Sequence, residues 1–155
     1  MPSGGSPRGR RSRPDIGASR HDARERALSL LYEAEVKHQG AQHIVAELAV
    51  APDPYAAAVA TGVAEHGARI DGLVSDAAVG WELDRMPVVD RTVLRMATWE
   101  LLERPDVPTA VIIDEAVELA KRFSTDQSGG FVNGVLATIA RQVRGDGAPA
   151  PTGAS

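Results

Sequence analysis

The chain has 155 residues, no cysteine and a formal net charge of −4 at pH 7. This length suits one compact domain, and the lack of cysteine excludes a disulfide scaffold, a thiol nucleophile and Cys-ligated metal sites. The longest stretch without a charged residue covers residues 127–140, which is shorter than the roughly 20 apolar residues of a membrane-spanning helix. No apolar run follows the N-terminal arginines, so we expect no secretory signal and a cytoplasmic location.

The charge is distributed unevenly along the chain. Residues 1–26 hold seven arginines and three acidic residues, a balance of +4, whereas the remainder carries −8. A basic end on an acidic body is typical of a segment that meets a polyanion. All seven bases are arginine, whose planar guanidinium pairs with phosphate and stacks on bases, which suits RNA. The alternative is a disordered arm that only improves solubility.

The two ends differ in composition from the middle of the chain. Residues 1–18 are rich in Gly, Ser, Pro and Arg and cannot bury enough apolar surface to fold alone, so a flexible basic arm is expected there. Residues 145–155 are expected to form a second flexible segment. Between them, residues 19–144 show helical patterns and almost no strand signal. We therefore predict a compact all-α domain of six or seven helices.

Two helices are predicted at the start of this domain. The first begins after Ser19, a favourable N-cap residue, and runs to about residue 38, with Gly40 as its stop. Alanine and leucine recur along it at helical spacing, which gives it one apolar face. A short helix near residues 41–49 follows.

A third helix is expected from Pro54 toward residue 79. Asp53 and Pro54 are a cap and a first-position residue, respectively. The segment contains three glycines, each of which costs about 1 kcal/mol relative to alanine in a helix. We therefore expect a kink, a break or the close packing of another helix near Gly62, Gly67 and Gly72.

The next helix is predicted to be the central one. It begins at Pro87 and runs to about residue 103, and its apolar residues spread around much of its circumference. A helix of this kind is buried on several sides. Pro105 and Pro108 then force a turn.

The last two helices are amphipathic. Residues 109–123 place charged side chains on one side and apolar side chains, including Phe123, on the other. After a turn over residues 124–130, a final helix is predicted from Phe131 to about residue 144, with Ser128 as its cap.

No catalytic or metal-binding constellation is present in the sequence. The four histidines have no metal-ligand spacing, and no serine lies in a G-x-S-x-G elbow. Residues 129–134 have two glycines at phosphate-loop spacing but lack the Lys-Ser/Thr pair that should follow. We therefore expect no enzyme activity, no metal and no cofactor, although backbone amides at this helix start are able to hold one phosphate.

Five short motifs occur in a fixed order along the chain. They are RHDARERALSLLY at 20–32, VLRMATWEL at 93–101, DVP at 106–108, DEAVELAKRF at 114–123 and FVNGVL at 131–136. Their order and spacing resemble the bacterial NusB family, and the resemblance covers most of residues 20–140.

The resemblance implies a transcription antitermination factor without catalytic activity. NusB proteins pair with NusE, which is also a protein of the small ribosomal subunit, and the pair recognises the single-stranded boxA element in ribosomal RNA operon transcripts. The complex joins other Nus factors on RNA polymerase and suppresses premature termination. We therefore expect boxA RNA and NusE as direct partners, and other Nus factors and RNA polymerase as indirect ones.

The basic arm and the matched motifs give nine candidate RNA-binding residues. Single-stranded RNA is held by cationic contacts to phosphates and by stacking of bases on aromatic or guanidinium planes. Arginines of the arm and of the first helix suit the phosphates, and the aromatic and amide residues come from segments that match the family. The candidates are Arg10, Arg11, Arg13, Arg20, Arg24, Tyr32, Gln127, Phe131 and Asn133.

Alternative roles remain open at four matched positions. Tyr32 and Phe131 fall at helix positions that also suit a core side chain, and Asn133 is equally able to bond a nearby backbone. Asp90 lies in a matching segment but is also placed to cap its helix.

The sequence departs from the family pattern at two places. His21 and Asp22 interrupt the opening run of arginines, and Gly129 and Gly130 stand where bulkier polar residues are common. An aspartate beside the phosphate path weakens binding, so RNA contact is expected to depend more on the arm or on NusE.

Two other interpretations of the resemblance stay open. NusB-like domains also begin certain ribosomal RNA cytosine methyltransferases, an interpretation that requires a catalytic domain after this one. The other is a protein-interaction module or accessory RNA-binding domain, including a homodimer, without antitermination activity.

Overall fold

The computed structural model describes residues 16–145, and this part of the chain contains seven α-helices, one 3₁₀ helix and no strand. The elements are α2 (Ile16–Lys37), α3 (Ala41–Ala46), α4 (Pro54–Glu65), α5 (Gly67–Ala77), η1 (Leu83–Arg85), α6 (Val88–Glu103), α7 (Thr109–Phe123) and α8 (Ser128–Arg144). The all-α prediction is confirmed. None of the described helices is long and apolar enough to cross a membrane.

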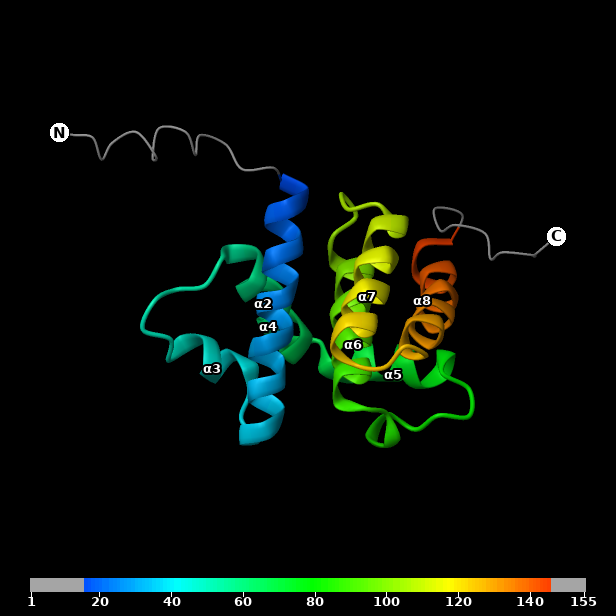
Figure 1. Ribbon diagram of the computed structural model, residues 1–155, viewed down its shortest axis with the longest axis horizontal. Coiled ribbons are helices and arrows are strands. Elements are labelled where there is room, and N and C mark those ends of the chain that lie inside the picture. The colour runs from blue at the N-terminus through cyan, green and yellow to red at the C-terminus, as the bar shows by residue number, and fades with distance from the viewer. Residues whose placement is uncertain (1–15, 146–155) are drawn as a thin grey trace.

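Helix α6 is the centre of the fold. It packs against α2, α4, α5, α7 and α8, and 11 of its 16 residues are buried. In Figure 1, α2, α3 and α4 lie to the left of α6 and α8 lies to its right, while α7 overlaps it in this view. The predicted central position of this helix, based on apolar residues that spread around much of its circumference, is therefore confirmed.

Two ion pairs define how α2 runs along α6. Near the start of α2, Arg24 Nη2 lies 2.8 Å from Glu100 Oε2, and near its end Glu35 Oε2 lies 3.0 Å from Arg91 Nη2. The residue numbers rise along α2 while those of the partners fall along α6, so the two helices are antiparallel. The start of α2 therefore lies beside the end of α6, and the end of α2 lies beside the start of α6.

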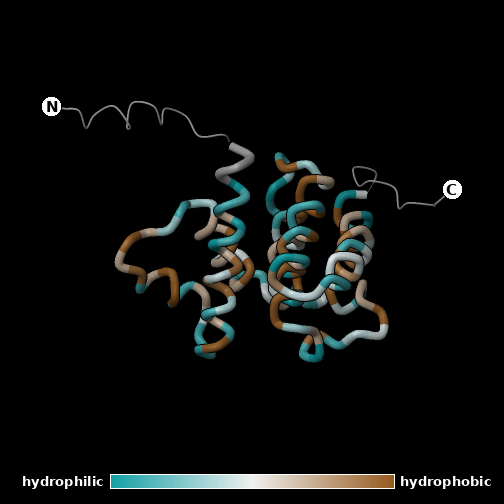
Figure 2. The backbone as a smooth tube through the Cα atoms, in the orientation of Figure 1, coloured by the Kyte–Doolittle hydropathy of each residue, from teal (hydrophilic) through white to brown (hydrophobic). Residues whose placement is uncertain are grey.

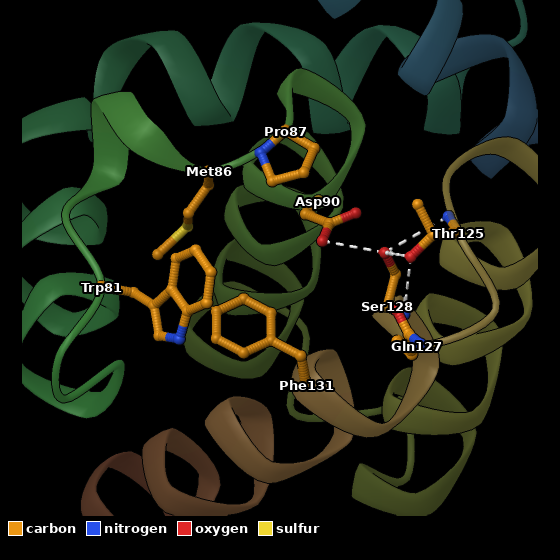
Figure 3. A pocket seen from close by; sticks show the side chains of 8 residues that line it. All are labelled: Trp81, Met86, Pro87, Asp90, Thr125, Gln127, Ser128 and Phe131. Atoms are coloured by element: carbon orange, nitrogen blue, oxygen red, sulfur yellow. Dashed lines mark hydrogen bonds between the residues drawn. The ribbon is translucent and has the colours of Figure 1, made fainter.

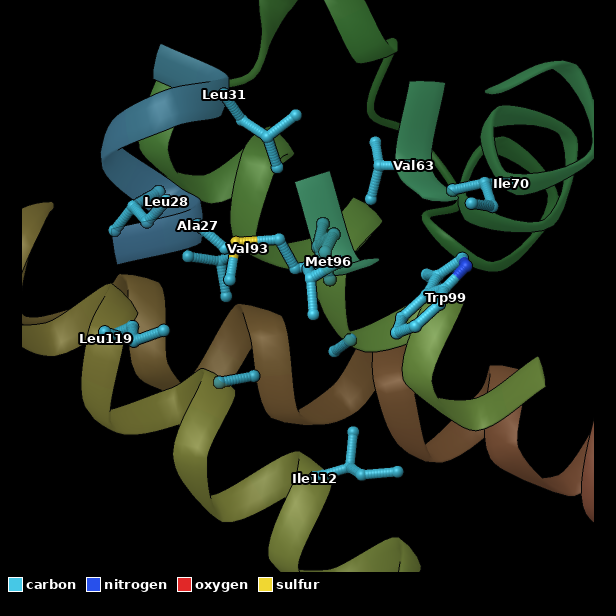
Figure 4. Close-up of a cluster of buried hydrophobic side chains, with 14 of the residues drawn as sticks. Ala27, Leu28, Leu31, Val63, Ile70, Val93, Met96, Trp99, Ile112 and Leu119 are labelled. Carbon is cyan, nitrogen blue, oxygen red and sulfur yellow. The ribbon is translucent and has the colours of Figure 1, made fainter. Parts of the chain in front are cut away.

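The long helix predicted over residues 54–79 is divided into two. His66 lies between α4 and α5 with φ −107° and ψ 25°, outside helical geometry. Gly62 packs directly against the indole of Trp99 on α6, where a Cβ has no space, and Figure 4 shows this indole within the buried cluster. Gly72 has open space around it instead. Both the expected break and the expected close packing are found, at different positions.

Several helix ends differ from the prediction. Helix α2 begins at Ile16, earlier than expected, and α3 ends at Ala46 instead of near residue 49. The 3₁₀ helix η1 was not predicted, since a single turn of three residues has no periodicity to detect.

Helix α8 begins at Ser128, three residues before the predicted start at Phe131. The two glycines there are inside the helix rather than in the turn. Gly129 is buried, and a Cβ on it would lie 2.8 Å from Cγ of Lys121 on α7. The missing side chain therefore allows the start of α8 to approach the end of α7.

Helix α7 has the predicted bounds and the predicted amphipathic pattern. Figure 2 shows hydrophilic and hydrophobic residues interleaved along it, and the helix packs against α6 and α8. Phe123 departs from the prediction, because it is 45% exposed and lies under the guanidinium of Arg122, 4.9 Å from the ring centroid. The buried residues of α7 are Thr109, Ile112, Ile113, Ala116, Leu119 and Ala120.

Candidate nucleic-acid interface

Arg20, near the start of α2, lies over the ring of Tyr55 from α4. Its guanidinium carbon is 4.2 Å from the ring centroid, which is within cation–π range. Asp53 fixes the first turn of α4, because its Oδ1 accepts hydrogen bonds from the backbone N–H groups of Tyr55 and Ala56. Arg20 remains partly exposed, so the ring supports a cation at the surface.

Arg24, one turn further along α2, is buried and only 3% exposed. Its Nε and Nη2 donate to the Glu100 carboxylate at 2.9 and 2.8 Å, and the Tyr55 hydroxyl donates to the same carboxylate. Burial lowers the pKa of Arg24, but hydrogen bonds and the charge of Glu100 outweigh this effect and raise it. A phosphate contact requires an accessible guanidinium, so the structure gives Arg24 a helix-joining role instead of the surface position expected for it.

The two residues that interrupt the arginine run have different surroundings. His21 Nδ1 lies 2.9 Å from Glu115 Oε1 on α7, and its Nε2 lies 3.1 Å from Glu25 Oε2. The hydrogen bond with Glu115 and the nearby carboxylates raise the pKa of His21. Arg122 of α7 also pairs with Glu25. His21 therefore joins α2 to α7, whereas Asp22 is exposed.

A second group of candidates surrounds the start of α8. The ring centroids of Trp81 and Phe131 lie 5.6 Å apart at an interplanar angle of 60°, an edge-to-face contact. Trp81 is 52% exposed, so aromatic surface is accessible here. Figure 3 shows the pocket of about 200 Å³ that these rings help to form, lined by Trp81, Met86, Pro87, Asp90, Thr125, Gln127, Ser128 and Phe131.

Asp90 is buried beside this pocket and joins two helix starts. Its Oδ2 accepts a hydrogen bond of 2.9 Å from the Ser128 hydroxyl. Its Oδ1 has no partner among the described residues, and the N-cap residue of α6 is Pro87, which has no N–H to donate. Ser128 was predicted to cap α8, but it is the first residue of the helix. Gln127 occupies the N-cap position and makes no side-chain cap bond.

The remaining candidates differ in exposure. Tyr32 is 47% exposed, so it is not a core residue. Gln127 and Asn133 are exposed, and Phe131 is half-buried. Gln127 and Phe131 line the pocket, whereas Asn133 does not. Three candidates of the basic arm lie outside the described residues, namely Arg10, Arg11 and Arg13.

The described candidates lie along the length of α6 rather than at one point. Arg20 is near the level of Glu100, and Phe131 is near Asp90; ten residues of helix span about 15 Å. Tyr32 lies between these levels, because α2 and α6 are antiparallel. A surface cation, an exposed aromatic ring and an aromatic pocket therefore follow one another at successive levels of α6.

Three residues that sequence reasoning missed accompany these candidates, two beside Arg20 and one at the pocket. They are Tyr55, Trp81 and Arg104, whose guanidinium carbon lies 4.8 Å from the Tyr55 ring centroid. The Asp53-Pro54 signal already placed Tyr55 at the start of a helix. Its position beside Arg20 arises from tertiary packing, which no local pattern reports.

Comparison with known proteins gives a consistent result. The NusB family matches residues 21–141. NusB from T. maritima is 40% identical, with a TM-score of 0.71 over 79% of this chain and 91% of that one. A chain from a crystal structure of a plectonemic RNA supercoil is 25% identical, with a TM-score of 0.71 and coverages of 82% and 97%. A chain from the crystal structure of antitermination factors NusB and NusE in complex with dsRNA is 25% identical, with a TM-score of 0.65 and coverages of 79% and 96%.

Proposed function

Because this chain belongs to the NusB family, we propose that it is a transcription antitermination factor that binds RNA together with NusE. The observation that carries the proposal is the family match over residues 21–141, which spans nearly the whole described fold. A relative of the same fold occurs in a complex of NusB and NusE with dsRNA. The RNA that we propose is the boxA element of ribosomal RNA operon transcripts.

The described surface supports a division of roles among the candidates. Arg20 supplies charge for the phosphate backbone, and the exposed ring of Tyr32 offers a stacking platform. Gln127 and Asn133 carry exposed amides that are able to read base edges, and Phe131 supplies a ring beside Gln127. Arg10, Arg11 and Arg13 add charge from the arm. Arg24 supports this surface by holding α2 against α6.

In this proposal the protein acts by binding alone. It brings RNA and NusE together, and no bond is made or broken. Residues 19–144 form the binding domain, and work on nascent transcripts places the protein in the cytoplasm.

A second candidate function is a protein-interaction module that does not contact RNA directly. It is favoured by large apolar side chains that are exposed: Val79 at 86%, Val36 at 59% and Trp81 at 52%. Scattered exposed apolar residues are normal on monomers, but they also suit contact with NusE or with a second copy of the chain.

Fluorescence anisotropy with a labelled boxA RNA and a scrambled RNA of equal length tests the proposal. Each RNA is titrated with and without NusE at two salt concentrations. We expect a preference for boxA that increases with NusE, and binding that weakens steeply with salt, because arginine–phosphate contacts release counterions.

Equal and weak binding of both RNAs under every condition contradicts the antitermination proposal. If NusE binds under those conditions and its affinity depends little on salt, the interaction module is the correct function.

A further inference from the structure

We propose that Tyr55 holds Arg20 and Arg104 together as one binding site for an RNA phosphate, and that Asp106 competes with that phosphate for Arg104. The inference rests on the proposed RNA-binding function and deepens it. It assigns a ligand group and two further residues, Tyr55 and Arg104, to the surface at the start of α2.

The geometry around Tyr55 brings two cations to one ring. The guanidinium carbons of Arg20 and Arg104 lie 4.2 and 4.8 Å from its centroid. The ring is fixed at both ends, since Asp53 caps its backbone and Glu100 accepts its hydroxyl. Two like charges, one on α2 and one on the C-cap residue of α6, thus contact the same aromatic ring.

The backbone that carries Arg104 is also fixed. Arg144, at the end of α8, donates to the carbonyl oxygens of Arg104, Glu100 and Leu101 at 2.8, 3.2 and 3.0 Å. Glu100 and Leu101 lie in the last turn of α6 and Arg104 is its C-cap residue, whose own N–H donates to the Glu100 carbonyl. The position of Arg104 therefore does not depend on a mobile loop.

Asp106 occupies the side of Arg104 that a phosphate requires. Arg104 Nε and Nη2 donate to its two carboxylate oxygens at 3.0 and 2.9 Å. This parallel pair of bonds is the geometry with which arginine also binds phosphate. Arg104 lowers the pKa of Asp106, and the charge of Arg20 lowers it further, so the carboxylate lies in the field of both cations.

The ion pair between Arg104 and Asp106 is easily exchanged. The side chains are 27% and 57% exposed, and exposed ion pairs contribute little to stability. An RNA phosphate that replaces Asp106 is able to make the same two bonds to Arg104 in the field of the same two cations, Arg104 and Arg20.

The first test removes the competing carboxylate. The expected result is a gain in RNA affinity, which a misfolded variant would not show. Asp106→Asn should tighten binding of a labelled single-stranded boxA RNA by about two- to fivefold, the size of one exposed ion pair. Asp76→Asn removes the same charge from an exposed position on α5 and serves as the matched control. Adding Arg104→Gln to Asp106→Asn should abolish the gain.

Salt dependence tests the positioning role of Tyr55. For single strands, each neutralised phosphate contributes about 0.7 to the slope of log K against log salt concentration. Arg20→Gln and Arg104→Gln should each reduce this slope, and Tyr55→Leu should reduce it although no charge is removed. Tyr55→Phe keeps the ring and should therefore keep the wild-type slope. Circular dichroism melting verifies that each variant is folded.

The outcomes separate this inference from the function on which it rests. If the wild-type chain binds no RNA with or without NusE, the proposed function fails. If it binds RNA but Asp106→Asn behaves like Asp76→Asn and Arg104→Gln keeps the wild-type slope, the inference is overturned and the function stands. A gain that appears in NusE affinity alone also overturns it, since the site then receives an acidic protein group.

Discussion

Arg24 and Glu100 form an ion pair whose burial determines what each side chain can do. Both are almost inaccessible, with side-chain exposures of 4% and 3%, and the Tyr55 hydroxyl fills a further position on the carboxylate. The pair joins α2 to α6, and Tyr55 adds α4. An arginine one turn after Arg20 has every sequence feature of a phosphate ligand, yet its partner lies 76 residues away, so only the fold assigns its role.

Replacing Arg24 by methionine should destabilise the protein by about 3–5 kcal/mol, because Glu100 remains as a buried charge without its counter-ion. The double variant Arg24→Met/Glu100→Met should recover much of this loss. Urea unfolding monitored by circular dichroism measures both. Retained stability in Arg24→Met together with loss of RNA binding would contradict the buried role and favour direct contact.

At the scale of helices, periodicity predicted most of the fold. The bounds of α7, the central position of α6 and the amphipathic faces follow from apolar spacing, which is a local property of the sequence. Helix ends were less predictable. The start of α8 fits Gly129 against Lys121 of α7, a contact between two elements. Such a contact leaves no local pattern, whereas the break between α4 and α5 was signalled by the glycines of this segment.

The glycines of α4 and α5 provide a test at this scale, because their surroundings differ. Gly62→Ala forces a methyl group into the indole of Trp99 and should destabilise the protein by about 1–3 kcal/mol. Gly72→Ala lies inside α5 with open space around it and should stabilise it by about 0.5–1 kcal/mol.

Chemical denaturation of both glycine variants, read at the midpoint and at constant m-value, measures the two changes. Similar effects in the two variants would mean that helix propensity alone governs these positions and that the packing of α4 against α6 is looser than the structure indicates.

At the scale of the whole molecule, the protein for which we propose RNA binding has a net negative charge of its own. Residues 27–155 carry −8, and several of their arginines are already paired: Arg91 and Arg95 with Glu35, Arg95 also with Asp71, and Arg122 with Glu25. The general field of the body therefore opposes RNA. Composition predicted a basic end, but the cations at the start of α2 are fewer than its arginine count suggests, because Arg24 is buried.

The N-terminal arm should therefore supply a measurable share of the electrostatic affinity. If Arg10 and Arg11 each neutralise one phosphate, Arg10→Gln/Arg11→Gln should lower the slope of log K against log salt concentration by about 1.4. Because phosphate contacts carry no base information, boxA and scrambled RNA should weaken by the same factor. Arg69→Gln/Arg141→Gln removes equal charge from exposed positions on α5 and α8 and should leave the slope nearly unchanged. Equal slopes in both double variants would assign the arm no RNA contact, and the binding charge would then have to come from the folded domain and NusE.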